Sequence, residues 1–385
     1  MPSKNIDKNG GNRSLRIGYL LDDTLDTPDG VQQYVLAVGE YFKAQGHKVH
    51  YLVAETHRRD IDNVHSLGKF VSLKFNGNFV RTPLPASTKE ISRLLDDLDL
   101  DVLHVQLGYS PFFGAKVIKR TQKKTRIVGT WHTFPSGTMH FVANWLLGLA
   151  IHSTLKKFSA TVGVSQATAD FAKKAFGTLS VVIPNAVPLE KFDIKHIVHS
   201  KKRIVFLGRF VERKGPIYLV HALARVEELG INLDNIEVVM AGKGPDLTKC
   251  IYLAKELGLD GLISFPGFVD ENEKATLLAS ADITVFPSTG GEAFGISVVE
   301  AMASGASIVL GGNNPGYASI LGKKPELLFN PKDIDQLALK LSYYLAIGDV
   351  QADEMKSWLK AESKQYDTPV ICAELEKLYV MPSSK

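Results

Sequence analysis

Two glutamates and three glycines stand close together in residues 288–302, and this segment has the strongest potential for chemistry. On one helix, the eight-residue spacing of Glu292 and Glu300 places their carboxylates on the order of 12 Å apart along the axis. This separation excludes a hydrolase site built on closely paired carboxylates. It suits one extended ligand that is contacted at both ends. Glu300 also has apolar neighbours, Val299 and Ala301, so its carboxylate is expected to need a partner.

Two cations, Arg209 and Lys214, lie in residues 207–215, between a predicted strand and a predicted helix. A guanidinium fork and an ammonium together could neutralise a diphosphate, although a solvated basic loop is the alternative. Gly30 begins the first predicted helix, where backbone amides can approach an anion; an ordinary loop glycine is the alternative there. The chain has no GxGxxG motif, which disfavours a dehydrogenase.

His132 follows directly on the predicted strand at residues 127–131. A residue at the carboxyl end of a parallel strand lies where such sheets bind ligands. Its imidazole could donate a proton, hydrogen-bond a ligand hydroxyl or simply face solvent, and the sequence leaves these three roles open.

These residues are positioned by an alternation of short β-branched runs with segments of helical periodicity. Two series are present, each beginning with a strand, a glycine-containing loop and an amphipathic helix that ends at a glycine. The pattern predicts an α/β protein with two doubly wound Rossmann-like domains that face each other across a cleft. The predicted strands are residues 17–21, 49–54, 102–107, 127–131 and 161–164, then 204–207, 238–241, 263–265, 283–286 and 307–310.

The length of 385 residues also fits two domains, since a typical domain has about 150 residues. A polar, basic stretch before residue 203 is the predicted linker. The predicted segments are a flexible N-terminal tail (1–14), the first Rossmann-like domain (15–190), the linker (191–202), the second Rossmann-like domain (203–350), a C-terminal helix (351–380) and a short tail (381–385).

Composition excludes several classes of protein. With 45% hydrophobic and 22% charged residues, the chain is expected to be globular, and its net charge of +4 is too small for a dedicated nucleic-acid binder. The two cysteines, Cys250 and Cys372, are too isolated for a disulfide framework or a zinc site, and no metal site is predicted. The N-terminus lacks the features of a secretory signal, so we expect a cytoplasmic protein.

Any contact with a membrane is expected to be peripheral, because the longest apolar run, residues 145–151, is far shorter than the roughly 20 residues of a spanning helix. Residues 89–98 and 139–158 have the amphipathic spacing of a helix that could lie on a membrane. Packing of both segments into the core is the alternative.

Taken together, these segments resemble the family 4 retaining glycosyltransferases of the GT-B architecture. The glutamate pair at positions 292 and 300 is the most specific mark of that family. Residues 289–302 and 75–81 are most similar to the bacterial phosphatidylinositol mannosyltransferases. The matching pieces are residues 26–32, 101–105, 129–133, 182–185, 207–209, 214–215, 290–296 and 300–303.

The resemblance implies roles for the residues on the donor side of the cleft. Arg209 and Lys214 would hold the donor diphosphate, Glu300 would accept hydrogen bonds from the ribose, and Glu292 and His132 would contact the transferred sugar as the catalytic pair. The amides near three further residues would assist with the diphosphate: Gly30, Gly295 and Ile296. Three others would line the nucleotide side: Gly242, Lys243 and Val269.

On the acceptor side, the resemblance places Gln32 and Arg81, whereas Asp23 stands where the mannosyltransferases carry a tyrosine. Asp29 replaces one glycine of their first loop and adds negative charge beside the predicted diphosphate. The implied partners are a nucleoside diphosphate sugar, with GDP-mannose favoured over a UDP-sugar, and a lipid or polyol acceptor such as phosphatidylinositol at the inner face of the cell membrane. No nucleic acid is expected.

The sequence requires no cofactor, and Mg²⁺ could accompany the nucleotide. Retention in this family is usually explained by a front-face attack, in which the leaving phosphate helps to deprotonate the acceptor. Two alternatives stay open on the sequence: a sugar-nucleotide epimerase with the same GT-B shape, and a catalytically inactive protein that binds a nucleotide sugar.

Overall fold

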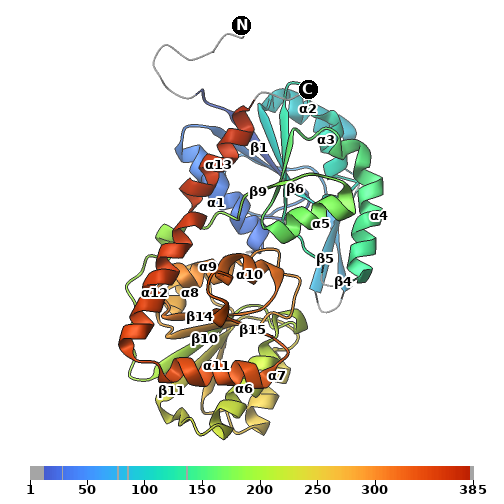
Figure 1. Ribbon diagram of the computed structural model, residues 1–385. Coiled ribbons are helices and arrows are strands. Elements are labelled where there is room, and N and C mark those ends of the chain that lie inside the picture. The colour runs from blue at the N-terminus through green and yellow to red at the C-terminus, as the bar shows by residue number, and fades with distance from the viewer. Residues whose placement is uncertain (1–12, 28, 76–77, 85, 136–137, 382–385) are drawn as a thin grey trace.

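The computed structural model describes residues 13–27, 29–75, 78–84, 86–135 and 138–381, with the side chains of residues 71–83 and 138–140 outside that description. Its described part forms two lobes, one above the other in Figure 1, and each lobe is built on a parallel sheet. This arrangement confirms the predicted pair of doubly wound α/β domains.

The first domain contains a seven-stranded parallel sheet in the order β3-β2-β1-β6-β7-β8-β9. All six residues of β6 are buried, as expected for a strand covered by helices on both faces. The strand order reverses between β1 and β6, the point at which such sheets bind ligands. The strands are β1 (Arg16–Leu21), β2 (Lys48–Val53), β3 (Val64–Ser66), β6 (Val102–Leu107), β7 (Arg126–Trp131), β8 (Ala160–Gly163) and β9 (Val181–Val182).

Helices and one hairpin complete the first domain. The antiparallel pair β4 (Phe70–Phe75) and β5 (Asn78–Pro83) forms a separate two-stranded sheet, which the sequence did not predict. In Figure 1 this pair lies at the lower right of the upper lobe. The helices are α1 (Gly30–Ala44), α2 (Thr88–Leu98), α3 (Gly114–Arg120), α4 (Thr138–Leu155) and α5 (Gln166–Phe176).

The second domain repeats this plan with a six-stranded parallel sheet in the order β12-β11-β10-β13-β14-β15. Its strand order reverses between β10 and β13, so both domains have their reversal next to their first strand. The strands are β10 (Lys202–Leu207), β11 (Ile236–Ala241), β12 (Ile263–Gly267), β13 (Ile283–Phe286), β14 (Ile308–Gly312) and β15 (Leu328–Phe329). The helices are α6 (Pro216–Glu228), α7 (Leu247–Glu256), α8 (Glu271–Ala279), α9 (Ile296–Ala303), α10 (Pro315–Leu321) and α11 (Ile334–Ala346).

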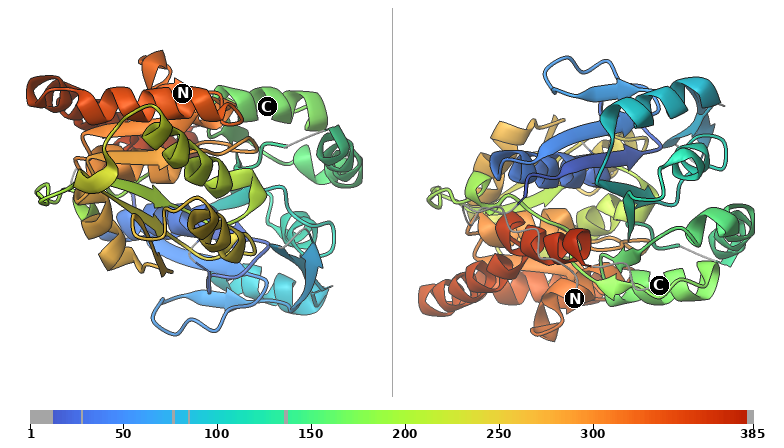
Figure 2. Two further views of the ribbon diagram at one scale, coloured as in Figure 1. Left: turned by 90° about the horizontal axis from the view of Figure 1, so that it is seen from below. Right: turned by 90° about the horizontal axis from the view of Figure 1, so that it is seen from above.

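The C-terminal segment is two α-helices rather than the single predicted helix at residues 351–380. The first, α12 (Asp349–Ser363), packs on the second domain, and α13 (Thr368–Val380) packs against α1 of the first domain. Figure 2 shows these helices along one side of the molecule. The break has a clear cause, since Pro369 lacks an amide hydrogen and Asp367 caps α13 by accepting a hydrogen bond from the amide of Thr368 at 2.9 Å.

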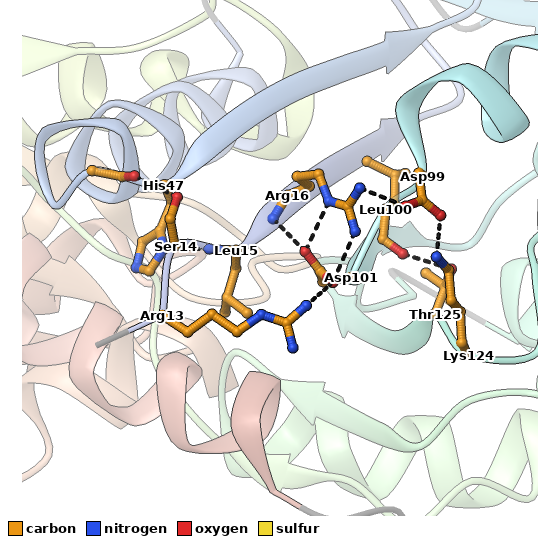
Figure 3. Close-up of polar contacts among 11 residues, drawn as sticks. Arg13, Ser14, Leu15, Arg16, His47, Asp99, Leu100, Asp101, Lys124 and Thr125 are labelled. Atoms are coloured by element: carbon orange, nitrogen blue, oxygen red, sulfur yellow. Dashed lines mark hydrogen bonds and ion pairs between the residues drawn. The ribbon is translucent and has the colours of Figure 1, made fainter. Parts of the chain in front are cut away.

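An ion-pair cluster, drawn in Figure 3, joins the segments at the amino-terminal ends of β1, β6 and β7. Arg16, at the start of β1, pairs with Asp99 at 2.6 Å and with Asp101 at 3.1 Å, and Asp99 also pairs with Lys124. Arg13 pairs with Asp101 at 3.0 Å, and Ser14 donates a hydrogen bond to the carbonyl of Gly46. These two residues of the predicted tail therefore contact the domain, whereas residues 1–12 lie outside the described part.

Helix α13 is anchored by a buried polar contact. The Tyr379 hydroxyl lies 2.6 Å from Nδ1 of His104 on β6, and the other ring nitrogen of His104 lies 2.7 Å from Oγ1 of Thr130 on β7. Burial lowers the pKa of His104 to about 3, so the ring is neutral at pH 7. A residue that arrives from the C-terminal segment thus completes the hydrogen bonding of the first-domain core.

We predict that Tyr379→Phe destabilises the protein by about 1–3 kcal/mol, because it leaves His104 Nδ1 buried without a partner. Urea unfolding followed by circular dichroism measures the change. The matched control is Tyr343→Phe, since Tyr343 is 61% exposed and should tolerate loss of its hydroxyl. Equal stabilities for Tyr379→Phe and the unaltered protein would show that this contact does not anchor α13.

Candidate active site

A cavity of about 770 Å³ lies between the two domains and is lined by residues of both. It lies at the carboxyl ends of the strands beside the two reversals of strand order, where such sheets bind ligands. Eleven of the predicted site residues line it: Gly30, His132, Arg209, Lys214, Gly242, Lys243, Val269, Glu292, Gly295, Ile296 and Glu300.

Two of the predicted acceptor-side residues, Asp23 and Gln32, are not among the lining residues. Gln32 is buried, and its amide donates hydrogen bonds to the carbonyl of Thr24 at 3.1 Å and to Asp23 Oδ2 at 3.4 Å. Gln32 on α1 therefore contacts Asp23 in the loop after β1. The backbone of Arg81 lies on β5, but its side chain lies outside the described part of the chain.

The N-termini of two helices from different domains meet at the cavity. A methyl group built on Gly30, the first residue of α1, would lie 3.3 Å from Cδ1 of Ile296, the first residue of α9. Neither helix has a side-chain hydrogen bond at its N-cap, where Asp29 and Gly295 stand. Unpaired amides and the positive ends of two helix dipoles therefore face the same space, an arrangement that favours a bound anion.

Glycine is required where the ends of β10 and β11 come together. Gly242 has φ of 140°, and a Cβ at this position would lie 1.8 Å from the carbonyl oxygen of Gly208. Only a residue without a side chain permits this approach. Beside it, the Lys243 ammonium lies 5.6 Å from the centre of the Phe268 ring, which also lines the cavity.

The carboxylate of Glu292 lies next to two cationic side chains of the second domain. Its Oε1 accepts a hydrogen bond from Ser288 at 2.7 Å and pairs with Lys214 at 3.0 Å and with Arg213. Burial opposes ionisation of this carboxyl, but Lys214 and Arg213 outweigh it and hold its pKa below the usual value. Arg213 lines the cavity and was missed by the sequence analysis, although it lies in the same basic run as Lys214.

The expected helical relation between Glu292 and Glu300 is wrong. Glu300 lies on α9, but Glu292 lies in the loop before it, so the spacing of about 12 Å along one axis does not apply. Three glycines in the loop, Gly290, Gly291 and Gly295, have positive φ, which a right-handed helix does not allow. The loop turns Glu292 toward the basic segment of η2 (Glu212–Lys214).

Glu300 has the partner that its apolar neighbours required. Its Oε1 lies 2.7 Å from the ammonium of Lys274 on α8, and both side chains are less than 10% exposed. Burial raises the pKa of the Glu300 carboxyl, and the Lys274 charge opposes that rise. Lys274 was missed because nothing in the sequence links residues that are 26 positions apart on different helices.

His132 is held by groups of the first domain. Its Nε2 lies 2.7 Å from Oε1 of Gln106 on β6, and its ring centre lies 4.8 Å from that of Tyr34 on α1. Burial lowers the pKa of His132 to about 3. A neutral imidazole can hydrogen-bond a ligand hydroxyl, but it is not an imidazolium acid at pH 7. Asn185, buried and beside His132 in the cavity lining, is a further residue that the sequence analysis quoted without a role.

Two further findings concern metal ligands and membrane spans among the described residues. No group of three or more His, Cys, Asp or Glu side chains among them is arranged to hold a metal ion. None of the helices in the described part is both long enough and apolar enough to cross a membrane. The cationic side chains among the residues that line the cavity are those of Arg209, Arg213, Lys214, Lys243 and Lys274.

Known proteins provide an independent comparison. The family model "Glycosyltransferase Family 4" matches residues 28–191, and the model "Glycosyl transferases group 1" matches residues 189–365. A phosphatidyl-myo-inositol mannosyltransferase of Mycobacterium leprae is 31% identical over 302 residues, which cover 77% of this chain and 78% of that protein. The enzyme of the same name from Mycolicibacterium smegmatis is 29% identical over 377 residues, or 95% of this chain and 93% of that protein.

The fold also matches solved structures. Anabaena Alr3699/HepE in complex with UDP and glucose superimposes with a TM-score of 0.74 at 17% identity, covering 95% of this chain and all of that one. This structural likeness shows the fold alone. Together with the relatives, it confirms the resemblance inferred from the motifs.

The neutral state of His132 can be tested directly. With a pKa lowered to about 3, its ring signals in ¹H–¹⁵N spectra should not titrate between pH 8 and pH 5, and His132→Asn identifies them by their loss. The unfolded chain binds this proton near pH 6.5, so stability should also decrease as the pH falls from 6.5 toward 3. A titration midpoint near 6.5 in the folded protein would contradict the prediction.

Proposed function

We propose an activity for this chain, which belongs to the family 4 glycosyltransferases. The proposed reaction is the retaining transfer of a hexosyl group, mannosyl in particular, from a nucleoside diphosphate sugar to a lipid-linked or polyol acceptor. The observation that carries the proposal is the convergence of two uncapped helix N-termini with Arg209 and Lys214 on one cavity between the domains. The chain is an enzyme of the glycosyltransferase class; donor, acceptor and stereochemistry are the proposed parts.

The donor diphosphate is proposed to lie at the amides of α1 and α9, where Arg209 and Lys214 can reach it. As the bond to the sugar breaks, negative charge grows on the leaving phosphate. Cations and amides that are already in place stabilise that charge without reorganisation. Mg²⁺, where present, is proposed to arrive with the nucleotide.

Glu292 is proposed to bind the hydroxyls of the transferred sugar, because its Oε1 is held by Ser288 and two cations at the edge of the diphosphate site. His132 is proposed to contact the sugar from the first domain, as a neutral hydrogen-bonding group. Neither group is arranged as a free nucleophile, which supports a front-face mechanism in which the leaving phosphate accepts the acceptor's proton.

The nucleotide is proposed to bind through Glu300, which accepts hydrogen bonds from the ribose, with the base toward Gly242, Lys243 and Val269. GDP-mannose is the favoured donor, since relatives over most of the chain are named as mannosyltransferases. A UDP-sugar is the second candidate, because Anabaena Alr3699/HepE, which has the same fold, was solved with UDP and glucose. A phosphatidylinositol-like acceptor follows from the names of the same relatives.

Transfer from GDP-mannose and from UDP-glucose to vesicles that contain phosphatidylinositol tests the donor and the acceptor. We expect mannosyl transfer, a GDP dissociation constant about 10- to 100-fold larger in Arg209→Met, and a kcat about 100-fold lower in Glu292→Gln with GDP still bound. Arg225→Met is the matched control, since Arg225 on α6 pairs with the exposed side chains of Glu228 and Asp335 and is not among the residues that line the cavity.

Two outcomes would replace the proposal. Interconversion of the sugar nucleotide without an acceptor indicates an epimerase. Tight nucleotide binding without turnover, unaffected by Glu292→Gln, indicates an inactive nucleotide-sugar-binding protein.

Contact with a membrane surface is proposed to occur through α4 of the first domain. The other predicted membrane segment, α2, packs into the core through Ile91 and Leu95, which are buried. Helix α4, in contrast, exposes an apolar face that consists of Val142, Trp145, Leu146 and Leu149. Lys156 and Lys157 follow directly, and cations beside an apolar face favour anionic lipid.

We predict that Trp145→Ser combined with Leu149→Ser lowers binding to phosphatidylinositol vesicles by about tenfold or more, because two large apolar groups no longer enter the interface. Sedimentation with vesicles measures the change. Leu339→Ser in the second domain, which alters a side chain of similar exposure, serves as the control. Undiminished sedimentation of the double variant would place the membrane contact elsewhere.

A further inference from the structure

A hydrogen bond crosses the cleft at the end where we propose that the nucleotide binds. Gln33 on α1 of the first domain donates from Nε2 to Oε1 of Glu271, the first residue of α8 in the second domain, at 2.7 Å. Both residues line the cavity. The contact lies on the same helix start, α1, that meets Ile296 of α9.

The second carboxylate oxygen of Glu271 leads inward. Oε2 lies 2.8 Å from the ammonium of Lys274, which is also the partner of Glu300 at 2.7 Å. The Lys274 side chain is 8% exposed and also lies over the ring of Phe192, at 5.2 Å from its centre. Burial lowers the pKa of Lys274, but the two carboxylates outweigh it and keep the ammonium charged.

The three contacts form a relay from the first domain to the buried carboxylate: Gln33, Glu271, Lys274 and Glu300. Glu271 is the least constrained of these residues in the second domain. Its side chain is 57% exposed and would move freely without a second partner. Gln33 supplies that partner only when the two domains are together. The buried pair at the inner end needs close geometry to offset the cost of removing two charges from water.

We propose that Gln33 is a positioning residue for nucleotide binding: by holding Glu271, and through it Lys274, it fixes Glu300 in the orientation that accepts the ribose hydroxyls. This inference rests on the proposed function in assigning the ribose to Glu300. Its consequence is reciprocal coupling. Closure of the domains improves the nucleotide site, and a bound nucleotide favours the closed domains to the same degree.

A double-mutant cycle measures the relay. The dissociation constants of GDP and UDP are determined by calorimetry for the unaltered protein, Gln33→Ala, Glu271→Ala and the double variant. Each single variant is expected to bind the preferred nucleotide about three- to tenfold more weakly, and the double variant no more weakly than Glu271→Ala, because both changes break one chain of contacts. Glu273→Ala, which removes an exposed acid from the same helix, is the matched control and should bind normally.

Nucleotides that lack ribose hydroxyls show whether the relay acts through Glu300. With 2′,3′-dideoxy-GDP or 2′,3′-dideoxy-UDP, the loss caused by Gln33→Ala should disappear. Lys274→Met should weaken binding of the normal nucleotide more than Gln33→Ala does, and Lys274→Arg should recover part of it, since an arginine can still bridge the two carboxylates.

Two results overturn the inference alone: losses that multiply in the double variant, and equal losses for the normal and the dideoxy nucleotide. Failure of the unaltered protein to bind either GDP or UDP overturns the proposed function and this inference with it.

Discussion

Positive charge concentrated at a cleft between two domains is the constraint on which the rest of this structure depends. The uncapped amides of α1 and α9 face the same space as Arg213 and Lys214, and Lys214 is only 21% exposed. Such an arrangement requires an anion. In this structure the carboxylate of Glu292 is the anion that pairs with Arg213 and Lys214 through Oε1. The hydroxyl of Ser288 also donates a hydrogen bond to this oxygen. The proposed donor diphosphate would supply further negative charge at the helix amides.

The arrangement of the two sheets brings the N-termini of α1 and α9 together. In each sheet, the loops beside the reversal of strand order lie at the cleft. Gly242, which has no side chain, lets the ends of β10 and β11 approach closely. The return of the chain through α12 and α13 joins the domains a second time, because Val187 and Asp367 pair as a parallel bridge between the two connecting segments. Tyr379 then inserts its hydroxyl beside His104 in the first-domain core.

The central strands could be predicted because burial on both faces leaves short, mostly apolar runs, as in β6 and β10. Short edge strands such as β9 and β15, with two residues each, carry no such signal. The glycine-rich loop before α9 was identified as important, but its conformation was not, since positive φ at Gly290 and Gly291 ends any helical interpretation there.

Most of the candidate site residues could be listed from the sequence, whereas their partners could not. Lys274 reaches Glu300 over 26 positions, Gln106 reaches His132 over 26, and Gln33 reaches Glu271 over 238. Only the folded chain brings such pairs together. The contacts of Gln32 with Thr24 and Asp23 could likewise not be predicted from the sequence, and its assignment to the acceptor by resemblance stays a prediction.

A crystal structure of the protein with bound GDP tests the central claim most directly. The account predicts the two phosphates at the first amides of α9, within hydrogen-bond distance of Arg209 and Lys214, with both ribose hydroxyls on Glu300. Phosphates bound away from α9, with Lys214 still paired only to Glu292, would contradict it.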